Sequence, residues 1–522
     1  MGMGVNPFLP VWEYIPDGEP HVFGDRIYLF GSHDTEGGKR YCAEQNYVGW
    51  SAPLSDPTAW EYAGVIYEAS QDPDFTEDHF CDLYAPDVVR GNDGRYYLYY
   101  GFSDDGHDKI RAAVCDEPNG HYEYYGYVKN PDGNPVNEYL MGDPAVINDN
   151  GIIRMYCGWS LSMVAAGAHS QGRGMEDEKR HNPAAGSDQA AKRLQMPKPG
   201  SDAMRYALQP IYKMLFHRNE EATGNLEYPL MGANTFELED DMLTIRGRMK
   251  RIVAGQFDTP EESSFYGHAF YEASSIRKIY GTYYFIYSSE NSNELCYATS
   301  RYPDRDFVYR GTIISNGDVG YNGRRSEDRL NMTANDHGSL ECINGQWYIF
   351  HHRQTHRSTF SRQACVERVE IKADGSIAQV ECTSMGFNDG PLKTEGVYPA
   401  VISCVLTNGH MPHCTNTLLE DDIPCITNDG EDRFITGISD GTVIGYKYFA
   451  FHGQAAFGIL YRSEGGGTLD VYADEEKIAE FAVQKQELWS KQISDINTNG
   501  TKALYLKYRG QGHMDIKDIF FK

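Results

Sequence analysis

The sequence has no apolar run long enough to span a bilayer, and it is poor in basic residues. Its 522 residues include 47 Lys and Arg against 75 Asp and Glu, which gives a formal net charge of −28. An acidic chain repels phosphate backbones, so we expect neither nucleic acid nor a membrane as a partner. The first ten residues lack the basic start and apolar core of a signal peptide. This predicts a cytoplasmic protein, or a secreted one whose leader has been removed.

Paired cysteine motifs are also missing. The 11 cysteines are scattered and odd in number, and no two form a C-x-x-C pair, which argues against zinc and redox motifs. We expect most of them to be buried thiols that pack as small apolar side chains. Cys404, Cys414 and Cys425 lie close enough in sequence to leave one disulfide open.

Aromatic residues are abundant instead, at 13% of the chain with 38 Tyr, which suits β-rich folds and surfaces that stack on sugars. Five segments share a turn residue followed by alternating aromatic and aliphatic residues, the pattern of the second arm of a β-hairpin. These segments begin at Asp25, Gly94, Gly151, Gly281 and Gly345.

A polar residue precedes each of the five segments at a similar distance. In chain order these residues are Glu19, Asp87, Asp143, Glu272 and His337. A repeated hairpin sheet that brings one polar group to a shared place is how a propeller builds a site. The sequence therefore predicts an all-β fold with a five-bladed β-propeller over residues 1–385.

The third and fourth segments are separated by about one blade more than the others. The extra residues are rich in Ala, Met, Lys and Glu, which predicts a helical insertion at about 165–230. A hidden sixth blade is the alternative, but this stretch contains no aromatic hairpin, so we favour five blades. The first and last blades must then close the ring, because an open sheet edge is a liability.

Residues 390–522 have a different pattern. Short strands follow one another closely and no helical period appears, which predicts a β-sandwich domain. The chemistry is therefore expected in the first domain.

Three carboxylates of the repeat, Glu19, Asp143 and Glu272, suit glycosidic bond hydrolysis. That reaction needs a protonated acid and an ionised base on opposite faces of the sugar. A third carboxylate nearby raises the pKa of the acid by like-charge repulsion. Most Asp and Glu are surface or turn-capping residues, and that alternative stays open for each of the three.

Several short motifs, in order, resemble glycoside hydrolase family 43. They are Asn6-Pro7, an acid-Pro pair at Glu19-Pro20, LYAPDVV, GDPAV, FYEASSIRK, and NDHGSLE followed by HHRQT. The resemblance runs from about residue 6 to 385. It implies a five-bladed propeller with an inverting mechanism that removes xylose or arabinofuranose from plant polysaccharides and their oligosaccharides.

The resemblance also implies roles for individual residues. Glu272 would be the general acid, Asp143 would tune its pKa and orient it, and Arg353 would contact the sugar. His337 would hold a calcium ion in the central channel, directly or through water.

The base is the position where the sequence departs from the family. The family usually has Asp-Pro where Glu19-Pro20 stands. Alignment therefore assigns the base to Glu19. Asp17 is the alternative, because residues two apart on an extended strand point the same way.

Other side chains are candidates for sugar contact. Apolar sugar faces stack on aromatic rings, so a sugar platform or plain packing is open for Trp12, Trp159 and Phe23. His33, His351 and His352 lack the spacing of a helical metal motif, and we expect them in polar packing or sugar contacts.

The second domain resembles a family 6 carbohydrate-binding module, in DGTVIGYKYFAFHG, GGTLDVYADEEKIAEF and the closing strands. Its start departs from that family, and His513 stands where an Asn is often found. Sugar binding, bracing of the propeller, and shaping of the site entrance all stay open.

We predict an inverting exo-glycosidase that removes terminal pentoses from hemicellulose-derived oligosaccharides, as a β-xylosidase and/or an α-L-arabinofuranosidase. A galactosidase or endo-arabinanase on the same fold is one alternative. A non-catalytic carbohydrate-binding propeller, in which Glu19 marks a lost base, is another. The sequence does not predict an oligomeric state.

Overall fold

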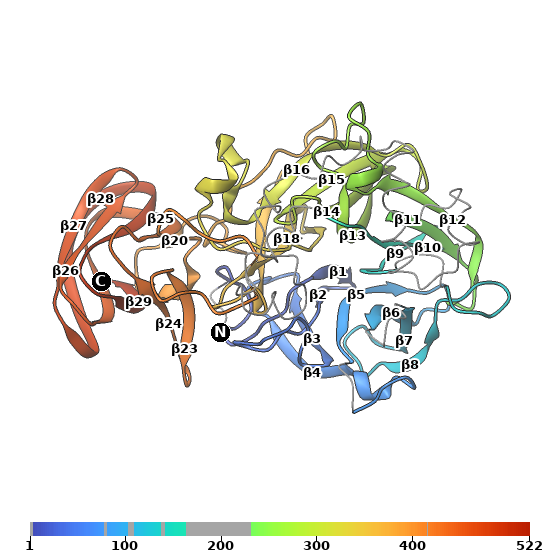
Figure 1. Cartoon of the computed structure of the whole chain (residues 1–522), viewed down its shortest axis with the longest axis horizontal. Helices are drawn as coiled ribbons and strands as arrows, with labels where there is room; N and C mark the ends of the chain where they lie inside the picture. Colours follow the sequence, from blue (N-terminus) through green and yellow to red (C-terminus); the bar gives the residue numbers. More distant parts are fainter. Residues whose placement is uncertain (1–3, 78–80, 103–108, 137–140, 163–230, 415) are drawn as a thin grey trace, which may run out of the picture.

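The computed structural model describes residues 4–77, 81–102, 109–136, 141–162, 231–414 and 416–522. Within these residues the secondary structure consists of β-strands and short 3-10 turns, without an α-helix. The predicted helical insertion at 165–230 lies outside the described residues. The strands form a ring of sheets and, beside it, a second all-β domain (Figure 1).

Five antiparallel sheets make up the ring, which confirms the five-bladed propeller. The first sheet holds β1 (Glu19–Phe23), β2 (Arg26–Phe30), β3 (Asn46–Pro53) and β4 (Glu61–Glu68). The second holds β5 (Leu83–Arg90), β6 (Tyr96–Phe102), β7 (Lys109–Cys115) and β8 (Glu123–Tyr127). The third holds β9 (Ala145–Asp149), β10 (Ile152–Trp159), β11 (Gly232–Leu238) and β12 (Ile245–Ala254). The fourth holds β13 (Phe270–Ile279), β14 (Thr282–Ser289), β15 (Glu294–Ser300) and β16 (Val308–Ser315), and the fifth β17 (Leu340–Ile343), β18 (Gln346–Gln354) and β19 (Arg362–Val369).

The five predicted hairpin arms are β2, β6, β10, β14 and β18, the second strand of each sheet. Strand β6 shows why their apolar residues alternate in type. Tyr97 and Tyr99 pack into the core shared with the third sheet, whereas Leu98 and Tyr100 pack into the core shared with the first. Successive side chains point to opposite faces of a strand, and both faces are buried here. The long sequence interval falls between β10 and β11, which pair directly within the third sheet.

The N-terminal segment closes the ring against the three-stranded fifth sheet. The Asn6 side chain donates to the Val366 carbonyl (2.8 Å) and accepts from the Val366 amide (2.9 Å). The Phe8 amide donates to the Ala364 carbonyl (3.2 Å), and the Phe8 ring packs on Phe350 in the core between the fifth and first sheets. The segment thus covers the edge of β19, which an open sheet would expose.

The second domain is a sheet of ten strands around one apolar core. The strands are β20 (Leu392–Lys393), β21 (Gly396–Pro399), β22 (Val405–Thr407), β23 (Cys425–Asp429), β24 (Asp432–Ile438), β25 (Val443–Ser463), β26 (Gly467–Ala473), β27 (Glu476–Val483), β28 (Gln486–Gly510) and β29 (Met514–Phe521). The core includes Phe449, Phe457, Leu504 and Phe521.

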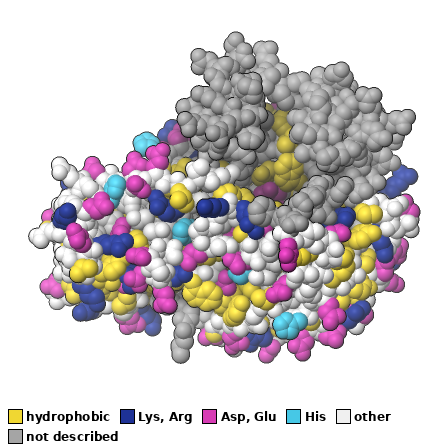
Figure 2. All heavy atoms as spheres, turned by 60° about the horizontal axis from the view of Figure 1, so that its bottom comes forward, with side chains coloured by type: hydrophobic (Ala, Val, Ile, Leu, Met, Phe, Trp, Pro, Cys, Tyr) yellow, Lys and Arg dark blue, Asp and Glu magenta, His cyan; other side chains and the backbone are white. Residues whose placement is uncertain are grey.

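All eleven cysteines are free thiols, and all except Cys115 and Cys342 are buried, as expected for small packing residues. In the described part of the chain, no helix has the length and apolar character that crossing a membrane requires. Figure 2 shows Asp and Glu side chains spread over one face with Lys and Arg between them, so the negative charge there is not gathered into a single patch.

Candidate active site

Four of the five propeller sheets bring a polar residue to one pocket, each in or just before its first strand. Asp17 lies just before β1, Asp143 before β9 and His337 before β17, while Glu272 is part of β13. All four line one pocket of about 170 Å³. The other described lining residues are Tyr41, Cys42, Tyr84, Ala85, Tyr271, Ser292, Asn335, Arg362 and Cys414.

Asp17 is held as an ionised carboxylate. Its Oδ1 accepts a hydrogen bond from Nη1 of Arg362 (2.9 Å), and its backbone amide donates to Nδ1 of His352 (3.1 Å). Its φ of 58° is unusual for a non-glycine residue and turns the chain just before the strand begins. Burial acts to raise the pKa of Asp17, but Arg362 and the neighbouring histidines outweigh it and lower that pKa.

Arg362, the first residue of β19, is positioned by Asp34. Its Nε and Nη2 donate to the two oxygens of Asp34 (2.8 and 3.0 Å), which is a bidentate pair. The guanidinium carbon lies 4.7 Å from the centroid of the Tyr41 ring. The arginine is therefore rigid, with one nitrogen left for Asp17. Sequence reasoning missed Arg362, because its pairing with Asp34 spans most of the propeller and leaves no local pattern.

Glu272 is the protonated counterpart of Asp17. A register shift in the β13–β14 pair falls at Glu272, and Ala273 has a φ of 65°. The Ala273 amide donates to Oδ2 of Asp143 (2.8 Å), which ties the two acidic segments together. Burial, followed by the negative charges of Asp143 and Asp17, raises the pKa of Glu272 to about 8. Glu272 therefore carries a proton at neutral pH.

Glu19 occupies a different level of the channel. It is 1% exposed, its Oε2 accepts from Nη2 of Arg277 (3.1 Å), and it is not among the lining residues of the pocket. Burial raises the pKa of Glu19 against the opposing effect of Arg277. The chain turns at Asp17 before β1 begins, and Glu19 follows as the first residue of that strand, outside the pocket lining. The structure thus places the alternative base, Asp17, in the pocket, and the aligned residue, Glu19, beneath it.

His337 lies between these two levels. Its Nδ1 is 3.9 Å from Oδ1 of Asp17, and its Nε2 is 3.9 Å from Oε1 of Glu19. Both Nε2 of His337 and Oε1 of Glu19 are buried without a hydrogen-bond partner. Such orphaned buried atoms are costly. The 3.9 Å between these two atoms would allow both to contact one cation.

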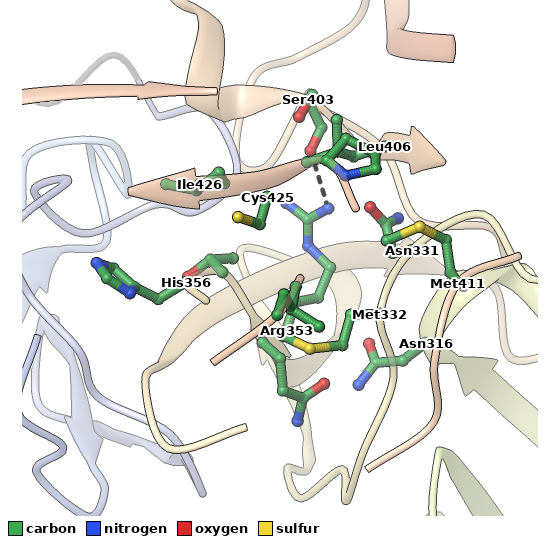
Figure 3. Close-up of a pocket in the computed structure, with 15 residues that line it drawn as sticks. Asn316, Asn331, Met332, Arg353, His356, Ser403, Leu406, Met411, Cys425 and Ile426 are labelled. Carbon is green, nitrogen blue, oxygen red and sulfur yellow. Dashed lines mark hydrogen bonds between the residues drawn. The ribbon is translucent and has the colours of Figure 1, made fainter. Parts of the chain in front are cut away.

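Arg353 does not reach the pocket. Its Nη1 donates to the Ser403 carbonyl (3.1 Å) and its Nε to Sγ of Cys365 (3.3 Å). It borders a cavity of about 20 Å³ between β18 and the second domain (Figure 3). Successive side chains of β18 point to opposite faces of the strand, and that of Arg353 points toward the second domain instead of the channel.

None of the three predicted platform residues, Trp12, Trp159 and Phe23, is among the residues that line the pocket. The Trp159 ring is 6.2 Å from that of Tyr271, which does line the pocket, so Trp159 backs the wall. Phe23 lies at the opposite end of the channel. There it borders a separate opening of about 240 Å³ together with His21, Arg277 and Glu341.

Comparison with known proteins finds a relative over nearly the whole length of the chain. No family model matches the sequence. A xylosidase/arabinosidase of Thermoclostridium stercorarium is 37% identical over 530 residues, covering 98% of both chains. The chain belongs to glycoside hydrolase family 43. Xylosidase/arabinosidase 43A of Humicola insolens is 26% identical over 65% of this chain and 88% of its own length.

One solved structure of this family is a β-xylosidase/α-arabinofuranosidase from a compost microbial metagenome, in complex with xylotriose and in a calcium-free form. It is 23% identical, covers 73% of this chain and 98% of its own, and has a TM-score of 0.47.

Proposed function

We propose that the protein is an inverting exo-glycosidase that removes terminal xylose or arabinofuranose from hemicellulose-derived oligosaccharides. One observation carries the mechanism: two carboxyl groups of the same pocket have pKa values shifted in opposite directions, lowered for Asp17 and raised to about 8 for Glu272. Such a split assigns base and acid in glycosidases. The xylosidase/arabinosidase relatives support the pentose class.

In the proposed reaction, Asp17 accepts a proton from the attacking water and Glu272 donates its proton to the leaving oxygen. Water attacks from the face opposite the leaving group, so the anomeric configuration inverts. Asp143 keeps Glu272 protonated and fixes the backbone beside it. Arg362 keeps Asp17 ionised and aimed into the pocket. This assigns the base to Asp17 in place of Glu19.

We further propose that a cation, calcium by family resemblance, is held by His337 and Glu19. Their orphaned Nε2 and Oε1 support this. A bound divalent ion would supply positive charge beneath the carboxylates and satisfy both atoms. His337 would then hold a fixed orientation beside Asp17.

For the second domain we propose a bracing role within a fold that resembles a carbohydrate-binding module. Its groove of about 810 Å³ is lined by charged and polar residues such as Arg462, Glu464, His513 and Asp515. The described lining contains no Phe, Tyr or Trp ring on which a sugar would stack. Phe434 and Trp489 lie instead against the Arg462 guanidinium, at 4.6 and 4.7 Å.

A panel of nitrophenyl glycosides tests the proposed function. We expect release of nitrophenol from the β-xyloside and the α-L-arabinofuranoside, and little from the β-galactoside. Proton NMR of the first product formed should show the inverted anomer. A retained anomer would contradict the mechanism, and turnover of the galactoside alone would contradict the pentose class.

A further inference from the structure

One wall of the pocket comes from outside the propeller. Among the described residues that line the pocket, Cys414 alone follows residue 362. It belongs to residues 408–424, which connect β22 to β23 in the second domain. We call residues 408–414 the wall segment.

The wall segment is fixed against the propeller by backbone hydrogen bonds to Thr333. The Thr333 amide donates to the Pro412 carbonyl (3.1 Å), and the Cys414 amide donates to the Thr333 carbonyl (2.7 Å). The Thr333 hydroxyl also pairs with Nδ1 of His413 (2.9 Å). These contacts hold Cys414 in place with a φ of 50°.

Apolar packing reinforces this attachment. Met411 of the wall segment packs in one buried cluster with Met332, Leu419 and Cys425 (Figure 3). The Leu419 amide donates to the Arg357 carbonyl of the propeller (2.8 Å). The second domain and the propeller therefore share a core next to the pocket, and the position of Cys414 depends on both.

Cys414 stands on the side of Glu272. Ala334 packs on Cys414, and the next residue, Asn335, hydrogen-bonds the Glu272 carboxylate. The Ser292 hydroxyl and the rings of Tyr271 and Tyr41 are also near the thiol. Asp17, in contrast, is held by Arg362 and His352 from β19 and β18. In an inverting site the acid faces the leaving group and the base faces the water. A wall beside Glu272 therefore borders the leaving group.

We propose that the wall segment of the second domain, through Cys414, forms the leaving-group side of the pocket and determines which aglycone the enzyme accepts. This rests on the proposed function. The small buried thiol leaves room for the sugar unit that follows the scissile bond and offers it an apolar surface. A larger side chain at this position would exclude that unit.

The test compares two substrates with the same xylose at the cleaved end. The leaving group is a second xylose in xylobiose and a single atom in xylosyl fluoride. For Cys414→Leu we expect the ratio of kcat/KM for xylobiose to that for the fluoride to fall about tenfold or more, since small steric changes in a pocket discriminate by this order. Cys414→Ala, which enlarges the pocket, should leave the ratio equal or raise it. Cys425→Leu is the matched control, because Cys425 packs in the same shared core outside the pocket.

An unchanged ratio in Cys414→Leu, or an equal fall in Cys425→Leu, would overturn the proposal. If Cys414→Leu does not fold, a lowered ratio in Cys414→Ala would overturn it. A wild-type protein that hydrolyses neither substrate would instead refute the proposed function, and the present inference with it.

Discussion

The central channel has two levels. Both contain buried carboxyl groups, but the surroundings of these groups differ. At the upper level, Asp17, Asp143 and Glu272 line a pocket with unequal proton affinities. At the lower level, Glu19 pairs with Arg277 (3.1 Å) and Asp87 with His21 (2.5 Å). Glu19 has a cationic partner, although its other oxygen has no hydrogen-bond partner, whereas the excess of negative charge at the upper level keeps Glu272 protonated. The difference lies in the partners, since all of these carboxylates lie in or just before the first strands of propeller sheets.

The largest expected difference between the two levels is in the effect of removing the base. Asp17→Ala should lower kcat by about 10²–10⁴-fold on every substrate, because the attacking water loses its proton acceptor. Added azide should restore turnover with an inverted glycosyl azide as product. Glu19→Gln is the matched control from the lower level and should lose much less. If Glu19→Gln is the inactive variant and Asp17→Ala stays active, the two levels have been assigned the wrong way round.

Removal of the acid should have the next largest effect. Glu272→Gln should lose about 10²–10⁴-fold on xylobiose, whose leaving group needs a proton, and much less on a dinitrophenyl xyloside, whose leaving group does not. Steady-state kinetics on both substrates measures the difference. Equal losses on the two would mean that Glu272 is not the proton donor.

The repeat and its polar residues were predictable because their signals are local. The alternation of aromatic and aliphatic residues in β6 and β14 reflects burial on both faces of the strand. This pattern can be recognised within each short run of sequence. Asp143 and Glu272 were predicted by their place ahead of such runs. The different positions of Asp17 and Glu19 were not predictable, because the sequence does not show that the chain turns at Asp17, and only the assembled pocket separates the two residues.

Two further features of the site depend on contacts distant in sequence. Arg362 is positioned by Asp34, which is 328 positions away in sequence. Arg353 lies in the motif that predicted a sugar contact, but its side chain faces the second domain. Cys414 reaches the pocket from another domain. Neither contact leaves a pattern in a single sequence.

The lower level should matter for stability more than for rate. Arg277→Met leaves Glu19 buried without its partner, and breaking such a pair costs about 3–5 kcal/mol of the free energy of unfolding. Lys278→Met is the control on the same strand. The exposed Lys278–Asp149 pair (2.6 Å) is worth about 0–1 kcal/mol. Urea unfolding of both variants measures the contrast. Similar losses in the two would mean that the lower level is not held by its ion pair.

The smallest expected effect concerns the pH at which the upper level works. Asp143 is one of the negative charges that raise the pKa of Glu272 to about 8. Asp143→Asn removes that charge, so the pKa of Glu272 should fall, and the acid should lose its proton at a lower pH. Activity falls on the alkaline side when the general acid ionises, so the alkaline limb of the kcat/KM profile should move to lower pH. Asp149→Asn, at the far end of the same strand, should leave that limb in place. If Asp143→Asn lowers the rate but the alkaline limb does not move, Asp143 acts only through its hydrogen bond from Ala273, and the raised pKa of Glu272 comes from burial and from Asp17.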